Sequence, residues 1–193
     1  GVRDPNFGAQ YKDTAHASSV QAVYEDIWTN YVDTGDGILY HPKGRIKVVT
    51  DAQFLRALTP ESQLSSGAVV VDDNLWESLT DAPEFTRRQV EKDRFNTVWL
   101  ALARGDKALL NEYRKAVAAE LKARHNYKRE NMNVWLAEEQ SVTTGRLWCV
   151  FRSNLYSNAN GINDLGISSG RLVGVAPEAQ WSSVSADEGV RAE

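Results

Sequence analysis

The chain has 193 residues, of which 42% are hydrophobic, 25% charged and 9% aromatic, and its formal net charge is −4. This composition is typical of a globular protein and argues against a disordered chain, a collagen-like fibre or a small disulfide-stabilised domain. A chain of this length can bury about 70% of its unfolded surface around one core. Its longest uncharged stretches, 62–71 and 153–163, are shorter than the roughly 18 apolar residues of a membrane span. We therefore expect one soluble domain.

The start of the sequence and its single thiol carry little information on location. Gly1 is not followed by a basic and then apolar stretch, so a secretory signal is not predicted, although one removed earlier would leave no trace. Cys149 has no second cysteine with which to form an internal disulfide, and no Asn-x-Ser/Thr acceptor occurs. These features favour a non-secreted protein, and the compartment stays unassigned.

Charge is distributed unevenly along the chain. Residues 83–130 contain 12 basic and 7 acidic residues and carry +5, whereas the remainder, with 10 basic and 19 acidic residues, carries −9. A dedicated duplex-DNA binder usually has a strongly basic domain, so this balance argues against that class. It is compatible with a local face that binds an anion.

The first third of the chain predicts an arm, a helix and a hairpin. Residues 1–15 are polar and lack an apolar period, which is typical of an extended arm. Apolar residues recur every three or four positions over 18–32, which predicts an amphipathic helix that ends at the Asp-Thr-Gly-Asp-Gly run 33–37. Two apolar runs within 38–49 flank a His-Pro-Lys-Gly segment and predict a β-hairpin with Gly44 at positive φ.

The middle of the chain predicts a short helix, a strand and a helical hairpin. Residues 50–53 match a capping box that would start a helix reaching residue 58, and the β-branched run 68–71 predicts a buried strand. A long helix is expected over 83–104, capped by Asp81. A Gly-Asp corner at 105–106 then begins a second amphipathic helix, so the two are expected to form an antiparallel hairpin or a sharp bend.

The last third predicts strands separated by a long loop. Periodicity over 132–136 is compatible with either helix or strand, whereas 146–152 alternates as a strand does. Residues 154–170 are rich in Asn, Ser and Gly, which predicts a long exposed loop of the kind that often serves binding. A final strand is expected over 171–175, before a polar tail.

These elements together predict an α+β fold. We expect a single domain in which a central helical hairpin, at about 83–130, packs on a small mixed or antiparallel sheet. The expected organisation is an extended arm over 1–15, the α+β domain over 16–177 and a polar tail over 178–193.

No catalytic residue, cofactor or metal site is predicted. The sequence contains no Gly-x-Gly-x-x-Gly, Walker-type, Gly-x-Ser-x-Gly or His-Glu-x-x-His motif. Cys149 lies in the middle of an apolar strand pattern, which is typical of a buried structural thiol. The three histidines lack the spacing of metal ligands, and there is no second cysteine to complete a zinc site.

A basic cluster is the main candidate for binding an anion. Its members are Arg124, His125, Lys128, Arg129, Arg146 and Arg152. Cations at the end of a helix complement its dipole, which is the simpler interpretation of the first four. The alternative is that they cradle a phosphate, a carboxylate or an acidic partner. The protein would then be an enzyme or binding domain for an anionic small molecule or nucleic acid, with Glu138 or Glu178 as a carboxylate catalyst.

Aromatic and asparagine residues supply candidate interface contacts. Six tryptophans are many for this length, and core packing explains those on predicted apolar faces. Trp135 and Trp181 are less well explained by packing and are candidate interface anchors. Asn158 and Asn160, in the predicted loop 154–170, are further candidate contacts.

The absence of an enzyme motif, together with arms and a polar loop, favours a structural or assembly protein. Such a protein would contact macromolecular partners, or further copies of itself, through its terminal arms and the loop 154–170. A component of a virion or of another large complex has this character. The alternative function is the anion-binding one described above.

Overall fold

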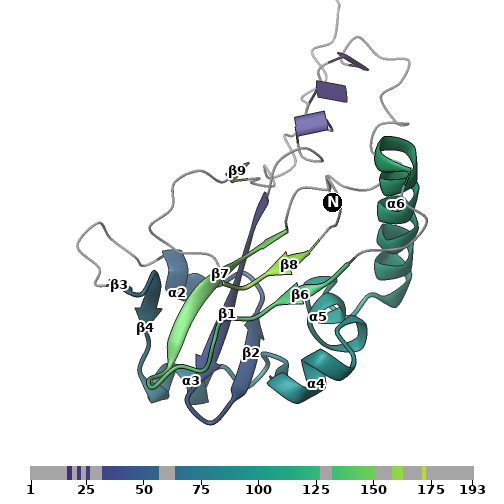
Figure 1. Ribbon diagram of the computed structural model, residues 1–193. Helices are drawn as coiled ribbons and strands as arrows, with labels where there is room; N and C mark the ends of the chain where they lie inside the picture. The colour runs from purple at the N-terminus through teal and green to yellow at the C-terminus, as the bar shows by residue number, and fades with distance from the viewer. Residues whose placement is uncertain are drawn as a thin grey trace, which may run out of the picture.

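The computed structural model has an α+β fold (Figure 1). It describes residues 17–18, 21–22, 25–26, 32–56, 64–126, 132–150, 158–162 and 171–172. The predicted arm 1–15 and tail 178–193 lie outside these residues, as does most of the predicted loop 154–170.

One sheet runs through the described part of the chain. Its strands are β1 (Val32–His41), β2 (Arg45–Val49), β3 (Leu64–Ser65), β4 (Ala68–Val70), β5 (Glu84–Thr86), β6 (Val134–Trp135), β7 (Thr144–Val150), β8 (Ala159–Asn160) and β9 (Arg171–Leu172). The main path is β3-β4-β7-β1-β2-β5, and every pair along it is antiparallel. β8 pairs with the second half of β7, β6 pairs with β8, and β9 runs parallel to β1.

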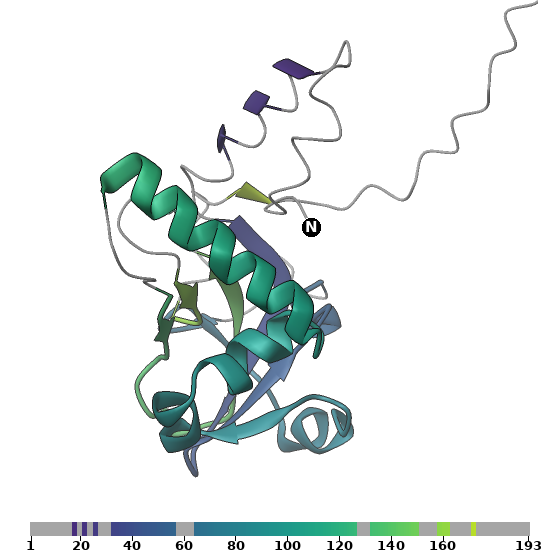
Figure 2. The same ribbon diagram turned by 90° about the vertical axis from the view of Figure 1, so that its right-hand side faces the viewer.

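Helices lie on both faces of this sheet. They are α2 (Gln53–Arg56), α3 (Asp73–Ser78), α4 (Arg87–Lys92), the π-helical turn η2 (Phe95–Trp99), α5 (Leu100–Leu102) and α6 (Lys107–His125). In Figure 2, α4, α5 and α6 lie in front of the sheet. Residues 17–18, 21–22 and 25–26 are also helical, in line with the helix predicted over 18–32.

Two apolar clusters hold these layers together. Ile38 and Trp148 of the sheet pack with Val117 and Leu121 of α6 on one face, and all four are fully buried. On the other face, Trp76 of α3 packs against sheet residues that include Leu39 and Val49. Neighbours in a strand point to opposite faces, so Ile38 and Leu39 belong to different clusters.

The predicted hairpin is confirmed, whereas the turn predicted before it is not. β1 and β2 pair in register, with Tyr40 opposite Ile46, and Gly44 has a φ of +69°. Residues 33–37, predicted to end a helix, lie inside β1 instead. Gly35, at a φ of +75°, accompanies a register shift between Asp33 and Gly37. The positive φ of Gly35 therefore allows a bulge in β1.

The helix predicted over 83–104 is not one continuous helix. Residues 84–86 form β5, because Phe85 pairs with Ile46 of β2. α4 then begins after Thr86, whose hydroxyl accepts from Gln89 N while the Gln89 side chain accepts from Thr86 N. This capping box supplies the helix start that Asp81 was expected to supply.

The second helix of the predicted hairpin begins where expected. α6 is capped by Asp106, whose carboxylate accepts from Leu109 N at 2.9 Å. The chain turns into it through Gly105, which has a φ of +79°. The predicted stripe is buried at Leu110, Val117 and Leu121. The arrangement of the two helical stretches as a hairpin stays a prediction.

Two further local predictions are corrected. α2 begins at Gln53, so Thr50 does not cap it. Residues 158–161 are buried, and 159–160 form β8 inside the predicted exposed loop. The segment 132–136, left open between helix and strand, contains β6. No helix among the described residues is long and apolar enough to span a membrane.

Candidate functional site

β6 is an edge strand that carries an exposed tryptophan. Among the described strands it pairs only with β8, and Figure 2 shows it at the margin of the sheet. The neighbouring segment alternates in exposure, because Met132 is fully buried and Val134 and Leu136 pack against the larger core cluster. Trp135 points to the opposite face and is 52% exposed. The sequence-based prediction that Trp135 is free to contact a partner stays a prediction, and its exposure is compatible with it.

The backbone of β6 has two edges, one towards β8 and one on the opposite side. The carbonyl oxygens of Asn133 and Trp135 accept from Ala159 N at 3.0 Å and Gly161 N at 2.9 Å, so they point towards β8. In an extended chain successive carbonyls point in opposite directions. The N–H and C=O groups of Val134 and Leu136 therefore point away from β8, along the outer edge.

Two arginines and a tyrosine fix this strand in place. Arg94 Nε donates to the carbonyl oxygen of Met132 at 2.5 Å, and Arg87 donates to that of Ala137. The hydroxyl of Tyr40 donates to Gly161 O at 2.9 Å and accepts from Ala137 N at 3.1 Å. Burial raises the pKa of Tyr40 well above its usual value, so the hydroxyl stays protonated. β6 is therefore a preformed edge.

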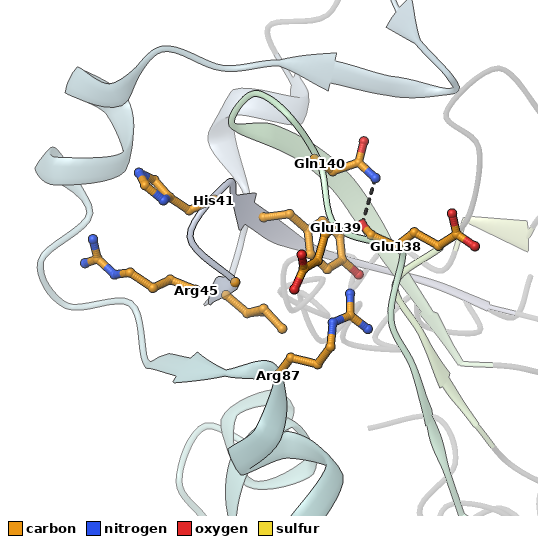
Figure 3. A pocket seen from close by; sticks show the side chains of 9 residues that line it. His41, Arg45, Arg87, Glu138, Glu139 and Gln140 are labelled. Carbon is orange, nitrogen blue, oxygen red and sulfur yellow. Dashed lines mark hydrogen bonds between the residues drawn. The ribbon is translucent and has the colours of Figure 1, made fainter.

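A shallow pocket lies at the end of this edge (Figure 3). It is lined by Tyr40, His41, Gly44, Arg45, Ile46, Arg87, Glu138, Glu139 and Gln140. In Figure 3, Arg87 and Glu139 point into its centre, whereas His41 and the head of Arg45 extend away to one side. The pocket thus mixes both signs of charge.

The cations of this pocket already have partners within the fold. Arg45 forms a two-point ion pair with Glu84, at 2.5 and 2.9 Å, which lowers the pKa of the Glu84 carboxyl. The Arg45 guanidinium and the His41 ring also lie 5.1 Å from the ring centroid of Trp76. These contacts explain the conformations of the two side chains by packing, and they hold both away from the centre of the pocket, where Arg87 lies near Glu139.

The predicted basic cluster is only partly described, and its two best-described members contact different partners. Arg124, near the end of α6, contacts Glu25 at 2.8 Å and Glu120 at 2.6 Å. The hydrogen bond with Glu120 raises the pKa of Arg124. Arg146 is buried in β7 and donates to the carbonyl oxygens of Ile162 and Ser66. Anion binding by these residues stays a prediction.

The remaining predicted site residues divide into described and undescribed positions. Asn158 is buried, and its side-chain oxygen accepts from Asn133 N at 3.0 Å. Asn160 is also buried, and its side-chain oxygen accepts from Ile162 N at 2.9 Å. Their described role is to hold the chain around β8. His125 lies at the exposed end of α6. The other predicted residues fall outside the described part of the chain: Lys128, Arg129, Arg152, Glu178 and Trp181.

No group of three or more His, Cys, Asp or Glu side chains that could hold a metal ion occurs in the described ranges. Cys149 is fully buried in β7, with its thiol 3.8 Å from Asn160 O. A buried thiol with this neighbour is not placed to act as a nucleophile.

Sequence reasoning proposed Trp135 as an interface residue but did not predict the edge strand that carries it. The edge depends on pairing with β8, and the apolar periodicity over 132–136 is compatible with either helix or strand. No protein-family model matches this chain, and neither the curated proteins nor the solved structures contain a significant match to it. The candidate site therefore rests on its own geometry.

Proposed function

We propose that this protein is a structural or assembly protein that contacts macromolecular partners. The observation that carries the proposal is the half-exposed indole of Trp135 on the edge of β6 that no other described strand pairs with. Tryptophan is enriched among the residues that dominate binding energy at interfaces. An unpaired strand edge is itself a template for another strand.

The same surface argues for protein contact over the binding of an anion. The edge offers backbone donors and acceptors beside an apolar ring, whereas the guanidinium groups of Arg124 and Arg146 are engaged within the fold. The predicted contacts through 1–15, 154–170 and 178–193 belong to the same proposal. A component of a virion or of another large complex is the class of protein that these features fit.

Sedimentation velocity and mass photometry of the purified full chain, over a wide concentration range, test this function. We expect the mean mass to rise with concentration, and limited proteolysis to cut the ends of the free protein. A protein that stays monomeric at every concentration, with both ends resistant to protease, would overturn the proposal.

A further inference from the structure

We propose that two copies of this chain associate through their β6 edges, in an antiparallel pair centred on Trp135. This inference rests on the proposed function and names the partner as a second copy. It would extend the sheet of one copy into that of the other around a two-fold axis. Such an interface is self-complementary, as a two-fold dimer requires.

The backbone of β6 is arranged for this register. The outward N–H and C=O groups belong to Val134 and Leu136, on either side of Trp135. In an antiparallel pair centred on Trp135, Val134 of one copy lies opposite Leu136 of the other and exchanges both backbone hydrogen bonds with it. The symmetry gives the same pair twice, so four hydrogen bonds form without disturbing the bonds between β6 and β8.

This pairing would bury the exposed indole ring of Trp135. Trp135 directs its own backbone groups inwards to β8, so Trp135 of one copy faces Trp135 of the other as a non-hydrogen-bonded pair. Side chains approach most closely at such positions, where the Cα atoms are about 4.5 Å apart. Directly opposed aromatic residues stabilise antiparallel strands. The pairing would therefore cover a ring that is 52% exposed in the single chain.

Charge at the two ends of the edge supports the same orientation. Arg94 donates to the carbonyl oxygen of Met132 at one end, and the exposed Glu138 lies at the other. Antiparallel pairing about Trp135 places Glu138 of one copy opposite Met132 of its partner, beside Arg94. A parallel pairing would instead place like ends together. Opposite charges across an interface fix its register and orientation.

Two variants test the edge without altering the β6–β8 pairing. Val134→Pro removes an N–H that points outwards, and Trp135→Ala removes the exposed ring. Val134→Ala retains the backbone N–H and is the matched control for proline. Val142→Ala is the control for the ring, because Val142 is another exposed apolar residue, 45% exposed, outside β6. Thermal unfolding of each variant verifies that it folds, and Trp135→Ala remains informative if the proline variant does not.

Sedimentation velocity then measures the association constant of each full-length protein. We expect Trp135→Ala to weaken dimerisation about thirtyfold, as truncation of a dominant interface residue does. Val134→Pro should also weaken it, and both alanine controls should match the wild type. Wild-type association that persists unchanged in Trp135→Ala would overturn this inference and leave the proposed function standing. A wild type with no association would overturn this inference, and it would overturn the proposed function as well only if both ends of the chain also resist protease.

A cross-link tests the register itself. In Trp135→Cys the two new thiols face each other at a Cα separation that a disulfide can span. Mild oxidation should therefore give a covalent dimer, whereas Asn133→Cys, which lies opposite residue 137 of the other copy, should not. The native Cys149 is fully buried and does not compete. Equal cross-linking of both variants would contradict the register.

Discussion

Lys47 holds Trp76 at two points. Its ammonium group donates to the backbone carbonyl oxygen of Trp76 at 2.7 Å and lies 4.9 Å from the centroid of the indole ring. It also donates to Leu79 O at 3.0 Å. These carbonyls end α3, where no later N–H of the helix can reach them. Lys47, a buried lysine of β2, thus caps the C-terminal end of α3, which lies on the face of the sheet opposite α6.

Replacing this lysine should destabilise the protein. We expect Lys47→Met to lower the free energy of unfolding by about 1.5–3 kcal/mol, because hydrogen bonds from a charged donor are lost and Trp76 O loses this partner, whereas Leu79 O keeps a bond from Ala82 N at 3.4 Å. Denaturant unfolding measures this change. Lys43→Met, at an exposed position of the adjacent turn, is the control and should be near neutral. Equal stabilities for the two variants would contradict a capping role.

The ion pair between Asp36 and Arg104 should respond unequally to the loss of each partner. The side chain of Asp36 is 5% exposed and that of Arg104 is 53% exposed, and their atoms meet at 2.8 and 3.0 Å. Arg104→Gln leaves a buried carboxylate without its cation, whereas Asp36→Asn leaves an arginine that water can solvate. We expect Arg104→Gln to cost about 1–3 kcal/mol, a value reduced by solvent screening at the exposed guanidinium.

Unfolding of both single variants and the double variant measures the coupling within this pair. The double variant should be more stable than the sum of the two single changes predicts, because they remove one shared interaction. Additive effects would mean that the pair contributes nothing.

Phe54 should make two glycines of the sheet intolerant of any side chain. A Cβ at Gly145 would lie 2.5 Å from the Phe54 ring, and one at Gly37 would lie 2.7 Å from it. We expect Gly145→Ala to lower the free energy of unfolding by about 1–3 kcal/mol through overpacking. The double variant with Phe54→Ala should recover part of that loss. A Gly145→Ala protein as stable as the wild type would show that the ring moves aside freely.

The sequence predicted the elements whose signals are local. The β1–β2 hairpin depends on Gly44, and the start of α6 depends on Gly105 and Asp106, so neighbouring residues suffice to define them. Residues 33–37 and 84–86 were interpreted wrongly because pairing with distant strands decides their structure. Gly37 lies opposite both Val49 and Leu147, and no local pattern records this.

The candidate site was predictable only in part, for the same reason. Trp135 could be selected because neither a helical nor a strand pattern explained it. Its place on an edge required the pairing of β6 with β8, and β8 lies in a segment whose Asn and Gly content predicted a loop. Asn158 and Asn160 are buried because their side chains bond to backbone N–H groups beside that strand. Composition alone could not distinguish this role from an exposed one.

Tyr40 should make stability depend on pH in the alkaline range. Burial raises the pKa of its hydroxyl, so the unfolded chain releases this proton before the folded chain does. The contribution of Tyr40 is therefore fully present below the ordinary tyrosine pKa, about 10, and is lost as the pH rises above it towards the folded-state pKa. Urea unfolding at about pH 8 and about pH 11 measures the loss.

Tyr40→Phe separates this effect from that of other titrating groups. At about pH 8 the variant should be less stable by about 1–3 kcal/mol, because Gly161 O and Ala137 N lose their shared partner. Its further loss on going to alkaline pH should be smaller than that of the wild type. Equal alkaline losses would contradict the role assigned to the hydroxyl.

Inorganic phosphate should not stabilise the protein through Arg124. The guanidinium of Arg124 is held by the carboxylates of Glu25 and Glu120, so a phosphate would have to displace both. A ligand that binds only the folded state stabilises it by RT ln(1 + L/Kd), where L is the free ligand concentration, so the melting temperature keeps rising as L exceeds Kd. We therefore expect wild type and Arg124→Ala to respond equally in a thermal-shift titration with phosphate and with nucleotides. A rise of several degrees in the wild type that Arg124→Ala abolishes would favour the anion-binding function over the assembly function proposed above.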